Sequence, residues 1–163
     1  MVRAVLRGFL QHVEGPEVNY VNAPSIATRL GLQVSEIKTT ETVDYAELLA
    51  VRAQAETGEA SVAGTFYGSV HNPRIVRING MPVEAVPHGV LLLVTNQDRP
   101  GVVGWIGTIM GRHGINIANM TLGRDQPAGK ALEVLNLDSA PSPAVLQEIR
   151  QDKDILDARV VAL

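Results

Sequence analysis

The chain after residues 87–89 (Pro-His-Gly) is a regular succession of apolar segments that leaves few folds open. Apolar runs predict strands at residues 90–95, 115–122, 130–137 and 155–162, and helical spacing predicts helices at residues 102–113 and 144–151. The order strand, helix, strand, strand, helix, strand is that of ferredoxin-like domains. We therefore expect a βαββαβ domain over residues 90–163, small enough to gain stability by association.

The first half of the chain mixes both kinds of pattern, so we expect a mixed α/β domain over residues 1–89 and an α+β fold for the whole. Helices are predicted at residues 2–13 and 22–31, and short strands at residues 18–21 and 32–37. Residues 44–56 fit either a helix with a capping box or an alternating strand. We favour a strand, paired with residues 62–67 through a turn at Thr57-Gly58.

A second hairpin is predicted over residues 74–86. Its strands meet at Asn79-Gly80, and Asn-Gly is the strongest short hairpin signal, because a type I′ turn needs positive φ at both central residues.

The composition excludes several classes of function. The formal net charge is −3 and no basic patch stands out, which argues against nucleic acid as a partner. No apolar run approaches the roughly 18 residues of a membrane span. There are no cysteines, which is compatible with the cytoplasm, and the four histidines lack the spacing of metal ligands, so no metal site is predicted. We find no catalytic constellation.

The run NQDRPGVVG over residues 96–104 is the strongest candidate site. It joins a predicted strand to a predicted helix, and such a turn leaves backbone N–H groups that can hold a small anion. Asp98 beside them could hold a cation. A site that offers both suits a zwitterion such as an amino acid. Two plainer interpretations stay open: Asp98 could cap the helix, and Asn116 could bond to local backbone at the start of its strand.

Residues 96–104 together with GINIA at residues 114–118 resemble the ACT domain, a small-molecule sensor of amino-acid metabolism. Three upstream segments are similar to the intervening, or allosteric substrate-binding, domain of long-form D-3-phosphoglycerate dehydrogenases: VNYVNAP at 18–24, GTFYG at 64–68 and RIVRING at 74–80. The resemblance implies an intervening domain over residues 1–89, incomplete at its start, and an ACT domain over residues 90–163.

This family implies a particular role for the chain. It is expected to be the regulatory C-terminal part of a cytoplasmic, NAD-dependent oxidoreductase of serine biosynthesis. No G-x-G-x-x-G follows a strand here, so we expect no cofactor in this chain and NAD only in the parent enzyme. The family also implies a homodimer through the ACT domains, or a tetramer.

The resemblance implies a ligand as well, because the family binds L-serine across two ACT domains. The positions that carry over are the side chains of Asn96, Asp98 and Asn116 and the backbone N–H groups of Gly101, Val102 and Val103. Asn96 departs from the histidine or aromatic residue common in relatives, which leaves ligand identity least secure there.

Some relatives hold an anion on cationic side chains of the intervening domain. Arg74 is at a position that is basic in relatives. Relatives have a second arginine near Val86 that this chain lacks, and the candidates to replace it are Arg77 and Arg124. The plainer interpretation is a solvated strand arginine.

We thus expect a serine-sensing module that regulates a dehydrogenase. Two alternatives remain: a dimerisation module without a ligand, and the β-chain of an iron–sulfur L-serine dehydratase, whose cluster cysteines a partner would supply.

Overall fold

The computed structural model describes residues 1–40, 44–45, 47–56, 58–68 and 72–163. It consists of two compact units, residues 1–44 and residues 45–163.

The first unit is a pair of helices, α1 (Val2–Glu14) and α2 (Ala23–Arg29), which confirms both predicted helices. Their small shared core contains Leu10, Val18, Ala23 and Ala27. Gly15 ends α1 at φ +96°, a backbone conformation that glycine adopts without strain.

The strand predicted at residues 18–21 is wrong, because two asparagine side chains take up the local N–H groups. Oδ1 of Asn19 accepts from the N–H groups of Val21 and Asn22, and Oδ1 of Asn22 accepts from that of Asn19 at 2.7 Å. Such bonds close a turn and remove the donors that a strand needs. The strand predicted at residues 32–37 is also wrong: its apolar side chains are exposed and no neighbouring strand pairs with it among the described residues.

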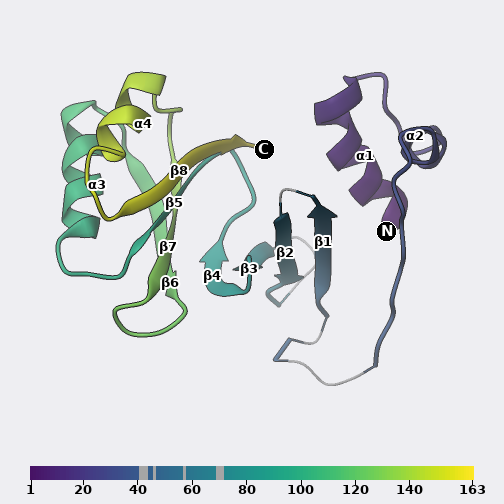
Figure 1. The fold of residues 1–163 in the computed structure, drawn as a ribbon, viewed down its shortest axis with the longest axis horizontal. Coiled ribbons are helices and arrows are strands. Elements are labelled where there is room, and N and C mark those ends of the chain that lie inside the picture. The colour runs from purple at the N-terminus through teal and green to yellow at the C-terminus, as the bar shows by residue number, and fades with distance from the viewer. Residues whose placement is uncertain (41–43, 46, 57, 69–71) are drawn as a thin grey trace. The chain divides into compact units, whose positions relative to one another are not determined.

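The second unit begins with an antiparallel meander, β1 to β4 (Figure 1). Its strands are β1 (Leu49–Ala55), β2 (Gly58–Phe66), β3 (Pro73–Ile78) and β4 (Met81–Ala85). The strand favoured for residues 44–56 is confirmed over β1; Thr57 of the predicted turn lies outside the described residues. Asn79 and Gly80 have φ of 49° and 80°, which confirms the type I′ hairpin between β3 and β4.

The remaining elements form the predicted βαββαβ unit. They are β5 (Val90–Gln97), α3 (Val102–Arg112), β6 (Ile117–Arg124), β7 (Lys130–Leu137), α4 (Pro143–Ile149) and β8 (Ile155–Ala162). The sheet is fully antiparallel in the order β6-β7-β5-β8, and α3 and α4 lie on one side of it (Figure 1). An apolar core that includes Leu92, Ile106, Leu135 and Ile149 joins the helices to this face. The α+β, ferredoxin-like prediction is confirmed.

The hairpin of β3 and β4 packs on the opposite face of this sheet, where Val83, Leu132 and Val134 share a second core. Contact is closest at Gly123 of β6: a Cβ atom there would lie 1.8 Å from the carbonyl oxygen of Pro82. Only glycine permits that approach. The predicted domain division at residue 89 stays a prediction.

Candidate functional site

The turn between β5 and α3 is capped by glycine alone. Gly101 is the N-cap residue at φ +99°, no side chain caps the helix, and the first intrahelical bond runs from the N–H of Trp105 to the carbonyl of Gly101. The N–H groups of Val102 and Val103 consequently have no hydrogen-bond partner among the described residues. These groups and the positive end of the helix dipole can accept a carboxylate.

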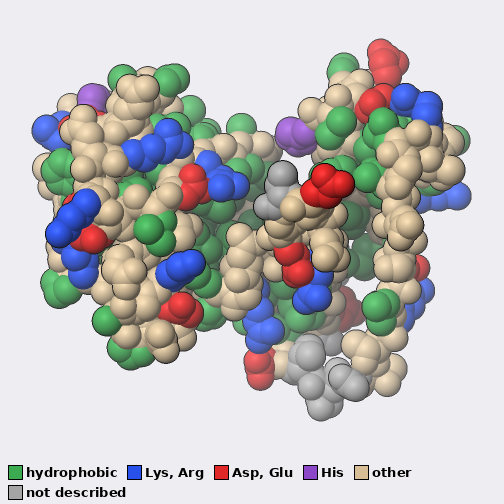
Figure 2. Space-filling view, viewed as in Figure 1, with side chains coloured by type: hydrophobic (Ala, Val, Ile, Leu, Met, Phe, Trp, Pro, Cys, Tyr) green, Lys and Arg blue, Asp and Glu red, His purple; other side chains and the backbone are tan. Residues whose placement is uncertain are grey.

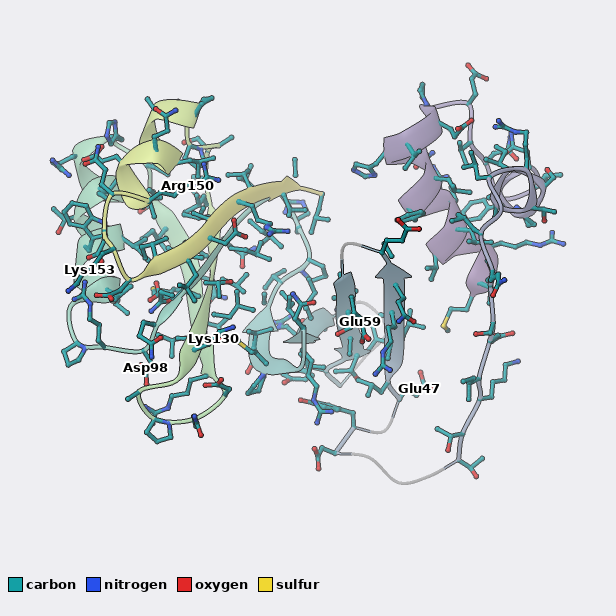
Figure 3. The ribbon with its side chains drawn as sticks, viewed as in Figure 1. Glu47, Glu59, Asp98, Lys130, Arg150 and Lys153 are labelled. Atoms are coloured by element: carbon teal, nitrogen blue, oxygen red, sulfur yellow. The ribbon has the colours of Figure 1, made fainter. Side chains whose placement is uncertain are left out.

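Asp98 does not cap the helix, so that alternative is wrong. Its Oδ2 instead accepts hydrogen bonds from Nη1 of Arg124 and from the N–H of Ala128, both at 3.2 Å. Its own N–H donates to the carbonyl of Gly129. Figure 3 shows Asp98 and Lys130 at the end of the sheet where β5 finishes and β7 begins. The carboxylate is thus fixed to the β6–β7 loop, and its Oδ1 makes no bond to the described residues.

Asn96 precedes this turn and is buried, with 2% of its surface exposed. Its Nδ2 donates to the carbonyl of Gln97 at 2.8 Å, whereas its Oδ1 is buried without a hydrogen-bond partner in the described structure. A buried, unsatisfied amide oxygen is rare and needs an explanation.

Asn116 lies far from these residues. Its Nδ2 donates to Oδ2 of Asp138 at 2.8 Å, so the alternative of a bond to local backbone does not describe its side chain. It immediately precedes β6, where Ile117 pairs with Leu137, which in turn pairs with Val90 at the start of β5. At about 3.4 Å per strand residue, Asn116 is roughly 24 Å from the turn at the other end of β5. One chain therefore cannot itself bring Asn116 to the turn that contains Asp98.

The turn is also fixed from the α4–β8 side by Arg99, a contact that sequence reasoning missed. Its Nη2 lies 2.6 Å from Oδ2 of Asp152, and its Nε donates to Asp154. The N–H of Asp154, and after it the Arg99 guanidinium, lowers the pKa of Asp152. The ion pair holds the turn against a loop that is 53 residues later in the chain.

Glu133 of β7 was missed as well. It is fully buried, neither carboxyl oxygen has a hydrogen-bond partner in the described structure, and burial raises its pKa to about 7. The available sequence signal was a glutamate between apolar neighbours, in the run ALEVL at residues 131–135.

Arg74 lines a cavity of about 310 Å³ together with Glu84, Val86 and residues 119–121. Its Nε lies 3.9 Å from Oε1 of Glu84, and its guanidinium lies 5.7 Å from the Tyr67 ring. Arg77 is exposed and is not part of this lining. The structure therefore gives one arginine, with an acidic neighbour, at the candidate anion position.

Within the described ranges no three potential metal ligands gather, and His71 lies outside those ranges. In the same part of the chain, none of the helices has the length and apolar character needed to cross a membrane. Side chains of both charges are interspersed on the face of the second unit that Figure 2 shows.

Comparison with known proteins places these features in a family. The four-stranded sheet with two helices on one face, together with a match to the ACT domain over residues 90–154, defines an ACT domain. Residues 1–79 match the D-3-phosphoglycerate dehydrogenase intervening domain. The chain belongs to the D-3-phosphoglycerate dehydrogenase family and corresponds to its regulatory C-terminal region.

Relatives from distant organisms agree. The D-3-phosphoglycerate dehydrogenase of Archaeoglobus fulgidus is 36% identical over 165 residues, which cover 100% of this chain and 31% of that protein. Those of Methanocaldococcus jannaschii (34%, covering 99% and 30%) and Bacillus subtilis (31%, covering 100% and 31%) match similarly. The chain thus spans less than a third of the length of these relatives.

Proposed function

We propose that this chain senses L-serine for feedback control of a cytoplasmic, NAD-dependent D-3-phosphoglycerate dehydrogenase. The observation that carries the proposal is the separation of Asp98 and Asn116 at opposite ends of β5. In a two-fold pair of ACT domains, the turn of one chain can meet Asn116 of the other, which makes two equivalent sites.

Each group has a chemical role in such a site. The free N–H groups of Val102 and Val103 would receive the serine carboxylate, together with the N–H of Gly101. The unbonded Oδ1 of Asp98 would receive the ammonium group. The amide of Asn116 would exchange its bond with Asp138 for the ligand. If serine binds one relative orientation of the two chains more tightly than another, it would shift the attached catalytic domains toward the arrangement that accompanies that orientation.

Chain mixing tests this arrangement. Asp98→Ala and Asn116→Ala should each abolish the heat of L-serine binding in isothermal titration. A 1:1 mixture, after dissociation and reassociation, should regain about a quarter of the sites, because half of the pairs are mixed and each mixed pair has one intact site. Asp157→Ala, which removes an exposed carboxylate from β8, is the control. Serine binding by either single variant, or no recovery on mixing, would contradict the shared site.

A dimerisation module without a ligand is the second candidate. It is favoured by the fact that Asp98 and Asn116 already have partners, Arg124 and Asp138. An intact dimer whose melting temperature ignores every amino acid would support it, since a ligand at 100 times its Kd adds about 2.7 kcal/mol of stability. The match of residues 1–79 favours a dehydrogenase parent over a serine dehydratase.

We also propose that Arg74 holds an anion such as phosphate in the 310 Å³ cavity. Arg74→Gln should abolish any phosphate-dependent rise in melting temperature, whereas Arg52→Gln, on exposed β1, should keep it.

A further inference from the structure

Two buried side chains on the helix-facing side of the ACT sheet have oxygen atoms with no hydrogen-bond partner among the described residues. They are Oδ1 of Asn96 on β5 and both carboxyl oxygens of Glu133 on β7. Asn96 alternates in phase with Leu92 and Val94, and Glu133 with Leu135 and Leu137, all of which pack in the core beneath α3 and α4. The side chains of Asn96 and Glu133 therefore lie on the same face of the sheet, in the core beneath α3 and α4.

The strand register makes them neighbours. Asn96 lies opposite Ala131, and Glu133 lies opposite Val94, so Asn96 and Glu133 are a diagonal pair on adjacent antiparallel strands. Diagonal Cα atoms are about 7–8 Å apart and their Cβ atoms are somewhat closer. Both side chains are long enough to meet across that gap.

No described cation compensates for Glu133. Its neighbour across β6 is Leu122, and the next residue of β6 on this face, Arg124, is bonded to Asp98. β5 contains no ionisable residue. The charged groups of the remaining elements have other partners. Arg112 of α3 and the adjacent His113 pair with Glu148 of α4, and Asp157 pairs with Arg159 on β8. Arg150, which follows α4, donates to the backbone carbonyl of Ala158 on β8.

Oδ1 of Asn96 and an ionised Glu133 carboxylate are both acceptors, and two acceptors that face one another in a dry interior repel. Each also loses the free energy of a hydrogen bond that it does not make. A proton resolves the conflict, because a neutral carboxyl group donates one hydrogen bond. Nδ2 of Asn96 already donates to Gln97, so the amide presents its oxygen, and not its nitrogen, to any remaining partner.

We propose that Glu133 is a proton-dependent positioning residue of the ligand turn. In its neutral form it donates a hydrogen bond to Oδ1 of Asn96 and holds the end of β5 in place. When the proton leaves, Asn96 loses this partner, its amide is attracted through Nδ2 to the carboxylate, and the bond to Gln97 is given up. The turn that starts at Gln97 then loosens.

Burial raises the pKa of Glu133 to about 7, so the change falls within the range in which cells operate. The effect on serine rests on the proposed function, whereas the hydrogen bond itself does not.

The unliganded chain tests the hydrogen bond directly. The side-chain amide resonances of Asn96, followed by NMR from pH 5.5 to 8.5, should shift with a midpoint near 7. Glu133→Gln, a permanent donor of the same shape, should remove the titration. Glu133→Met, which neither donates a hydrogen bond nor carries a charge, should also remove it and leave Oδ1 of Asn96 without this partner. Glu56→Gln, at an exposed turn position, should titrate like wild type. An Asn96 amide that is constant with pH, or that titrates equally in Glu133→Gln, overturns the proposal.

The pH dependence of serine affinity is the second test. This affinity should fall about three- to tenfold between pH 5.5 and 8.5, the effect of one hydrogen bond, and should be independent of pH in Glu133→Gln. Serine binding that keeps the wild-type pH profile in Glu133→Gln counts against the positioning role. If serine fails to bind at any pH while the Asn96 amide still titrates, the proposed function is wrong and the hydrogen bond stands.

Discussion

The buried carboxyl group of Glu133 makes the stability of the second unit depend on pH in the direction opposite to most carboxylates. In the folded chain its pKa is about 7, and in the unfolded chain it has the ordinary value of 4.5. Below pH 4.5 both states are protonated, and the group costs nothing. Between pH 4.5 and 7 the unfolded state ionises first, so the fold loses stability as pH rises. Above pH 7 both states are ionised and the loss is complete.

The magnitude follows from the two pKa values. One pKa unit corresponds to 1.36 kcal/mol, so the full loss is about 3 kcal/mol, of which about 2–3 kcal/mol falls between pH 5 and pH 8. That is a large share of the 5–15 kcal/mol that stabilises a typical domain. Replacement of Glu133 by Gln should remove the titration, so the variant should gain on wild type as the pH rises.

Urea unfolding measures this effect. Trp105 is the only tryptophan, and its Nε1 donates to the carbonyl of Ile149, so its fluorescence reports on the unit that contains Glu133. The two proteins should be compared at pH 5 and pH 8 at one protein concentration, since dimer formation also contributes to stability. Glu56→Gln is the control, and its profile should parallel that of wild type. Parallel profiles for wild type and Glu133→Gln would refute the reasoning.

Three other substitutions test the packing. Gly123→Ala should destabilise the second unit by about 1–3 kcal/mol in urea unfolding, because its Cβ would overlap Pro82. The control Gly111→Ala, with open space around it, should be neutral or stabilising. Equal effects of the two substitutions would contradict the close contact. Gly80→Ala, at φ +80°, should lower the unfolding free energy by about 1 kcal/mol, and no loss would argue against the type I′ turn. Arg99→Ala should speed amide hydrogen exchange in residues 97–101 without speeding it in β6, and unchanged exchange would show that the ion pair does not hold the turn.

Local chemistry made much of the fold predictable. Asn79-Gly80 fixes its hairpin by backbone preference alone, and the alternating apolar segments after residue 89 fix the βαββαβ order. The same local reasoning failed at residues 18–21, where the apolar residues suggested a strand but Asn19 and Asn22 bond to backbone N–H groups.

The site was predictable as a segment but not as a set of contacts. The strand–turn–helix around Gly101 follows from the sequence, and the structure has it. The partners of Asp98 do not follow, because Arg124 and Ala128 come from a hairpin that is 26 and 30 residues later. Glu133 lies diagonally across from Asn96 only through the register of β5 and β7, which no single segment specifies.

The backbone contact at Gly123 has a mechanical consequence. The ACT sheet has α3 and α4 on one face, and the β3–β4 hairpin lies against its other face with no side chain between Gly123 and Pro82. No compressible layer separates the two backbones at that point. A change in the twist of β6 at Gly123 must therefore be matched by a displacement of Pro82 on β4.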